Sequence, residues 1–72
     1  MSLSATVWRL WDDAGRVTKC LLSERDNRWS LRVFTEAKIL ANERFCTDDS
    51  ALDRADEIWS LLVQQGWTAS FP

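Results

Sequence analysis

Polar and apolar residues alternate most regularly over residues 28–34. The apolar positions in this stretch fall on one parity and are Trp29, Leu31 and Val33. A period of two is typical of a strand with one face in the core and the other toward solvent. The pattern therefore predicts a strand over 28–34 whose Trp29 side faces the core.

Two earlier stretches also favour strands, because both are rich in β-branched, aromatic and other apolar residues. They cover about 5–12 and 16–24. The cluster Asp12 to Gly15 separates them, and Asp26 with Asn27 follows the second; Gly, Asp and Asn tolerate the backbone of tight turns. The sequence thus predicts strand, turn, strand, turn, strand.

The stretch 38–46 is compatible with two structures. Ile39, Ala41 and Phe45 share one parity, as in an edge strand, yet many of its residues are good helix formers. A short segment rarely forms an independent helix, and a fourth strand would widen the sheet beneath the helix that follows. We therefore expect a strand here and keep a helix as the alternative.

A helix is predicted over about 48–65. Residues 47–50 offer N-cap candidates, with Ser50 and Asp53 resembling a capping box, and Gly66 followed by Trp67 matches a helix stop. Seven apolar residues fill one arc of the helical wheel and are expected to face the core: Ala51, Leu52, Ala55, Ile58, Trp59, Leu62 and Val63. The tail, 68–72, is expected to be loosely held.

These elements predict an α+β fold in a single small domain spanning 1–72. It would be a four-stranded antiparallel meander with one C-terminal helix packed on one face, in the order ββββα. So short a chain can only just bury enough apolar surface to fold. Its five tryptophans raise the buried area per residue, and association with a second copy would be another way to raise it.

Composition argues against several classes of function. The chain has no histidine, its two cysteines match no zinc pattern, and no catalytic or phosphate-binding motif is present. We expect neither enzymatic activity nor a cofactor nor a metal site. Cys20 and Cys46 are interpreted as reduced thiols, and a redox pair would require them to lie within disulfide reach.

Neither a signal peptide nor a membrane-spanning run is recognisable, so a cytoplasmic protein without membrane contact is expected. The net charge is −2, but it is unevenly distributed. Residues 1–46 carry eight basic and six acidic side chains, whereas five acidic residues and one basic residue follow. An acidic helix and a mildly basic sheet should result.

The sheet face that the helix leaves open is the candidate interface. The side chains expected there, and proposed to bind a partner, are Arg9, Trp11, Arg28, Arg32, Phe34, Lys38, Leu40 and Arg44. The first interpretation is a non-enzymatic interaction module that forms a homodimer, or binds another protein, through this face or a sheet edge. The alternative is binding of single-stranded nucleic acid, which the sequence pI near 4.9 disfavours. A face without any binding role is the third interpretation.

Overall fold

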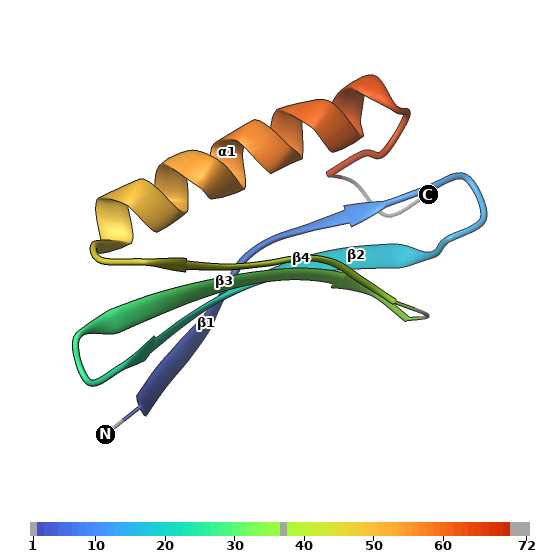
Figure 1. Cartoon of the computed structure of the whole chain (residues 1–72). Helices are drawn as coiled ribbons and strands as arrows, with labels where there is room; N and C mark the ends of the chain where they lie inside the picture. The colour runs from blue at the N-terminus through green and yellow to red at the C-terminus, as the bar shows by residue number, and fades with distance from the viewer. Residues whose placement is uncertain (1, 37, 70–72) are drawn as a thin grey trace.

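Four antiparallel strands form one sheet in chain order, and a single helix packs against one of its faces (Figure 1). The computed structural model describes residues 2–36 and 38–69. The elements are β1 (Ser2–Trp11), β2 (Val17–Arg25), β3 (Arg28–Thr35), β4 (Ile39–Phe45) and α1 (Asp48–Gln64). The predicted ββββα fold is confirmed, and 39–45 is a strand rather than a helix.

The turn between β2 and β3 consists of two residues in the left-handed region. Asp26 has φ 54° and Asn27 has φ 64°. Positive φ at both central positions is the geometry of a type I′ hairpin, whose twist matches that of the flanking strands. Asp and Asn accept this conformation at lower cost than other non-glycine residues, which is why the chain reverses here.

Both ends of α1 are capped. The Thr47 hydroxyl accepts a hydrogen bond from the Ser50 amide at 3.2 Å, so Thr47 is the N-cap. The helix thus begins where predicted, with one of the candidate residues as its N-cap, whereas Ser50 lies inside the first turn and is not the N-cap of a capping box with Asp53. At the other end Gly66, with φ 105°, lets the Trp67 amide reach back to the Leu62 carbonyl at 3.1 Å. This is the predicted glycine stop.

The core lies between α1 and the facing side of the sheet. Fully buried side chains from three strands meet the buried stripe of the helix; they are Leu10, Thr18, Cys20, Leu31, Val33, Ala51, Ala55, Ile58 and Leu62. A hydrogen bond links β1 to the helix, because the indole Nε1 of Trp8 donates to the Ala55 carbonyl at 3.1 Å. As predicted, the Leu31 side of β3 faces the core, with Trp29 half-buried.

The helix crosses the sheet diagonally (Figure 1). Near its start Arg54 contacts Glu43 of β4, and just beyond its end Thr68 pairs with Trp11 of β1 at the opposite edge. Among the described residues no second helix packs beside α1, so only its central stripe is buried. The predicted burial of three flanking residues is therefore wrong: Leu52, Trp59 and Val63 are 39%, 37% and 37% exposed.

Two bulges change which face some side chains occupy. The register between β1 and β2 shifts between Thr6 and Trp8, and Val7 packs against the core instead of the open face. Between β3 and β4 the register shifts after Val33, so that Ile39 pairs with Phe34. Ile39 consequently lies on the open face, contrary to the parity expected from the sequence.

The segment after the helix is held more firmly than predicted as far as Thr68. Its amide donates to the Trp11 carbonyl, and its carbonyl accepts from the Trp11 amide, both at 2.8 Å. Residues 70–72 of the predicted loose tail lie outside the described residues.

Within the described part of the chain, α1 is too short and too polar to cross a membrane.

Candidate binding site on the open face of the sheet

The strand register determines which side chains share the face opposite α1. Leu31 and Val33 turn to the helix, so the alternate residues of β3, Arg28, Ser30, Arg32 and Phe34, turn away from it. Following the register across the sheet places six cations on this open face. We call it the basic face and define it by Arg9, Lys19, Arg25, Arg28, Arg32 and Arg44.

Most of the site residues predicted from the sequence occur together on this face. Arg9 and Trp11 come from β1, Arg28, Arg32 and Phe34 from β3, and Arg44 from β4. Lys38 lines the same hollow as Arg32 and Phe34. Leu40 differs, because it sits in the bulge outside the paired register and is 41% exposed.

Sequence reasoning missed the contribution of β2. Lys19 is opposite both Arg9 and Phe34, Leu21 is opposite Arg32, and Arg25 is opposite Arg28. The sequence feature that could have indicated this contribution is the shared parity of Val17, Lys19, Leu21, Ser23 and Arg25. This feature is weak because the strand places apolar residues on both faces.

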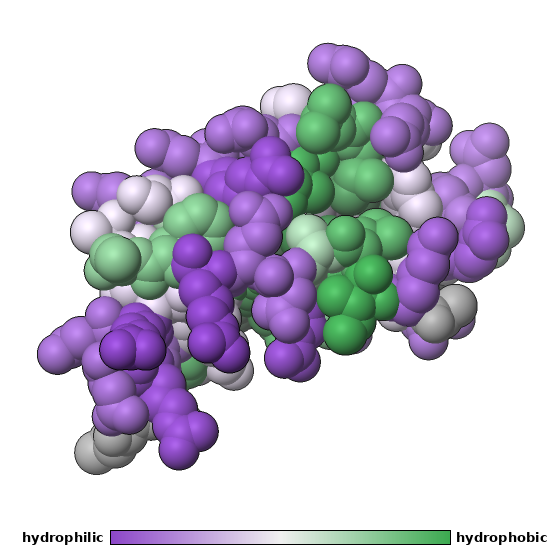
Figure 2. Space-filling view, in the orientation of Figure 1, coloured by the Kyte–Doolittle hydropathy of each residue, from purple (hydrophilic) through white to green (hydrophobic). Residues whose placement is uncertain are grey.

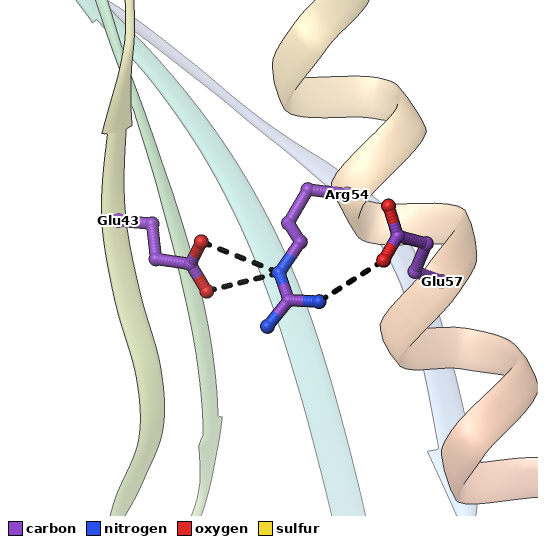
Figure 3. Close-up of polar contacts among 3 residues, drawn as sticks. All are labelled: Glu43, Arg54 and Glu57. Atoms are coloured by element: carbon purple, nitrogen blue, oxygen red, sulfur yellow. Dashed lines mark hydrogen bonds and ion pairs between the residues drawn. The ribbon is translucent and has the colours of Figure 1, made fainter.

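The acidic residues of the strands point away from the basic face. Glu43 is opposite Leu31 in the register, on the helix side. There its carboxylate accepts from Arg54 Nε at 3.1 Å, and Arg54 also donates to Glu57 at 3.2 Å (Figure 3). Glu24 is opposite Trp29, again on the helix side. Neither strand carboxylate therefore projects from the basic face.

Like charges stand directly opposite one another in two places on the basic face. Arg9 pairs with Lys19, and Arg25 pairs with Arg28. Such cross-strand pairs destabilise a sheet, by roughly a few tenths of a kcal/mol each. Among the described residues, the ion pairs involve Arg16 and Arg54 only, and none includes a cation of the basic face. The repulsion is therefore not relieved by an ion pair with any described carboxylate.

Shallow hollows occur between these side chains. One of about 440 Å³ is lined by Arg25, Asp26, Arg28, Ser30 and Arg44. A second, of about 320 Å³, is lined by Leu21, Arg32, Phe34, Thr35, Glu36, Lys38 and Ile39. The first is surrounded by guanidinium groups, whereas the second combines an aromatic ring with two cations. The carboxylates among these lining residues, Asp26 and Glu36, belong to the turns at opposite ends of the face.

The acids of the helix and the cations of the basic face lie on opposite sides of the molecule. The acids of α1, Asp48, Asp49, Asp53, Asp56 and Glu57, are all exposed, on the layer opposite the basic face. Figure 2 shows hydrophilic groups along the outer side of the helix and along the lower side of the molecule, with apolar groups between. Sheet and helix layers lie roughly 10 Å apart, beyond the Debye length of about 8 Å at physiological salt. A ligand on the basic face therefore experiences mainly the cations.

Within the described part of the chain, no group of three or more histidine, cysteine or acidic side chains is arranged to hold a metal ion. The two thiols lie in different environments, since Cys20 is buried and Cys46 is exposed, and neither forms a disulfide. The basic face is thus the most distinctive chemical feature that the fold assembles.

Comparison of the chain with protein-family models, curated proteins and solved structures finds no significant match.

Proposed function

We propose that the protein is a non-enzymatic binding module that holds single-stranded nucleic acid on the basic face. The observation that carries this proposal is that every charged side chain projecting from the strands on this face is cationic. The low sequence pI, which disfavoured this function, reflects the acids of the helix, of the turns and of the helix-facing side of the strands. A phosphate backbone on the face responds to the local charge, which is strongly positive.

A single strand fits the face better than a duplex does. Phe34 lies between Lys19 and Ile39 in the register and is half-buried, so part of its ring is accessible. An unpaired base can stack on such a ring while neighbouring cations contact phosphates. Bases inside a duplex cannot reach a sheet face in this way. The combination of ring and cations therefore favours single-stranded ligands.

The test is binding of a fluorescent fifteen-nucleotide oligo(dT), followed by anisotropy at about 50 mM salt. Wild type should bind, with an affinity that falls as salt rises, since each phosphate contact adds roughly 0.7 to the logarithmic slope. Arg32→Gln should weaken binding about 3- to 10-fold and lower the slope. Phe34→Leu should weaken binding through lost stacking without changing the slope.

Arg16→Gln is the matched control, because it removes the same charge from a turn where Arg16 is paired with Asp12 at 2.6 Å. This variant should bind within about twofold of wild type. Circular dichroism would establish that all variants fold. Absence of binding by wild type at low salt, or equal losses in the Arg16 and Arg32 variants, would contradict the proposal.

Homodimerisation is a second candidate function, and one observation favours an edge of the sheet over its face. Two basic faces would repel each other, whereas β1 begins with four exposed, uncharged residues, Leu3 to Thr6. Charge on an edge strand normally prevents such pairing. A two-fold axis at Ser4 would place Leu3 opposite Ala5 of the second copy, apolar against apolar. Both basic faces would then lie on the same side of an eight-stranded sheet.

This dimer is tested by sedimentation velocity at about 10 to 300 µM. Wild type should show a concentration-dependent dimer, and Ala5→Lys should remain monomeric because it places a charge on the edge. Ser60→Lys, at an exposed helix position, should behave as wild type. A wild-type monomer throughout the range, or a dimer that Ala5→Lys leaves intact, would contradict the edge interface.

A further inference from the structure

Three arginines surround the hollow of about 440 Å³ at one end of the basic face. Arg25 ends β2, Arg28 begins β3, and Arg44 lies near the end of β4. The register explains their proximity, because Arg25 is opposite Arg28, and Arg44 is opposite Ser30, two residues further along β3. The tight turn at Asp26 and Asn27 brings the first two together across a single hairpin.

The charge of this hollow favours an anion of high charge. No described carboxylate forms an ion pair with any of the three guanidinium groups. Asp26 lines the hollow as well, so its charge is three cations against one carboxylate, a net +2. Each guanidinium offers a planar fork of donors that matches phosphate oxygens. A dianion with three free oxygens would neutralise the net charge of the hollow and accept hydrogen bonds from its guanidinium groups.

We infer that this hollow binds a terminal phosphate of the nucleic acid strand, an inference that rests on the proposed function. A phosphodiester within a strand carries one charge and two free oxygens. A terminal phosphomonoester carries close to two charges and three acceptor oxygens. The hollow lies at the β2–β3 turn, where the sheet ends, and Figure 2 shows a hydrophilic cluster at this end of the molecule. A strand lying along the basic face can therefore end there.

The experiment compares three forms of one twelve-nucleotide oligo(dT): phosphorylated at the 5′ end, phosphorylated at the 3′ end, and without a terminal phosphate. Anisotropy competition should show that one of the two phosphorylated forms binds about tenfold more tightly than the unphosphorylated form. Arg44→Gln should remove most of that difference while weakening the unphosphorylated form no more than Arg9→Gln does. Arg9→Gln, at the other end of the face, should weaken all three forms equally.

The outcomes separate this inference from the proposed function. Equal binding of all three oligonucleotides would overturn the terminal-phosphate site and leave nucleic-acid binding intact. A phosphate preference that Arg44→Gln fails to reduce would also overturn it. If no oligonucleotide binds, the function fails, and titration with inorganic phosphate tests the hollow separately. Amide shifts at Arg28 and Arg44 that the Arg44 variant abolishes would then support the site, and unchanged shifts would overturn it.

Discussion

Replacing Leu31 with alanine is expected to lower the free energy of unfolding by about 3 kcal/mol, within a range of roughly 2 to 5 kcal/mol. Leu31 is 0% exposed, lies in the third of four strands, and belongs to the cluster that joins the sheet to α1. Removing its branched end leaves a cavity that the rigid sheet cannot close. A domain of this size has roughly 4 to 11 kcal/mol of stability in total, so the loss should be large.

Urea unfolding followed by tryptophan fluorescence measures this loss directly. Leu61→Ala is the control, since it makes the same chemical change on the helix where the side chain is 51% exposed. Its free energy of unfolding should stay within about 0.5 kcal/mol of wild type. A Leu31 variant less than about 1 kcal/mol below wild type would show that this side chain does not hold the two layers together.

The fold was predictable because its main signals are local. The alternation around Leu31 gives a strand and its buried side, and Asp26 with Asn27 gives a tight turn. The Gly66 stop gives the end of the helix. Each of these signals depends on neighbouring residues only, so it can be recognised without knowledge of the long-range packing.

Features that depend on long-range packing were not predictable. The bulge near Val7 and the one near Ile39 each move a side chain to the other face. The residue types at these two places do not indicate that the strand register shifts there. Trp59 flanks the buried stripe of α1, and its exposure depends on which elements lie beside the helix. Periodicity alone assigns such flanking residues to the core.

The candidate site was predictable in part for the same reason. Arg28 and Arg32 follow from the regular alternation of β3. Lys19 and Arg25 do not, because β2 has similar residues on both faces. The decisive feature, the turning of Glu43 away from the open face, follows from its shared parity with Ala41 and Phe45, whereas its ion pair with Arg54 depends on where the helix lies. Net charge describes the whole chain, whereas binding depends on how the register distributes the charges.

The thiol of Cys20 should react with Ellman's reagent at least about a hundredfold more slowly than that of Cys46 in the folded protein. Cys20 is 0% exposed, and burial raises its pKa to about 11. At pH 8 roughly one thiol in a thousand would be ionised, and only the thiolate reacts. Cys46 is exposed, so the folded protein should show one fast thiol, and the second should appear on unfolding in urea.

The same pKa gives a stability that falls at alkaline pH. Between about pH 9, where the thiol of the unfolded chain ionises, and about pH 11, the folded state retains a proton that the unfolded state releases. The unfolded state binds fewer protons, so the free energy of unfolding declines across this window by at most about 3 kcal/mol. Cys20→Ala removes this titration, and its stability should decline less steeply than that of wild type. Parallel declines, or two thiols of equal reactivity before unfolding, would show that Cys20 is accessible to water.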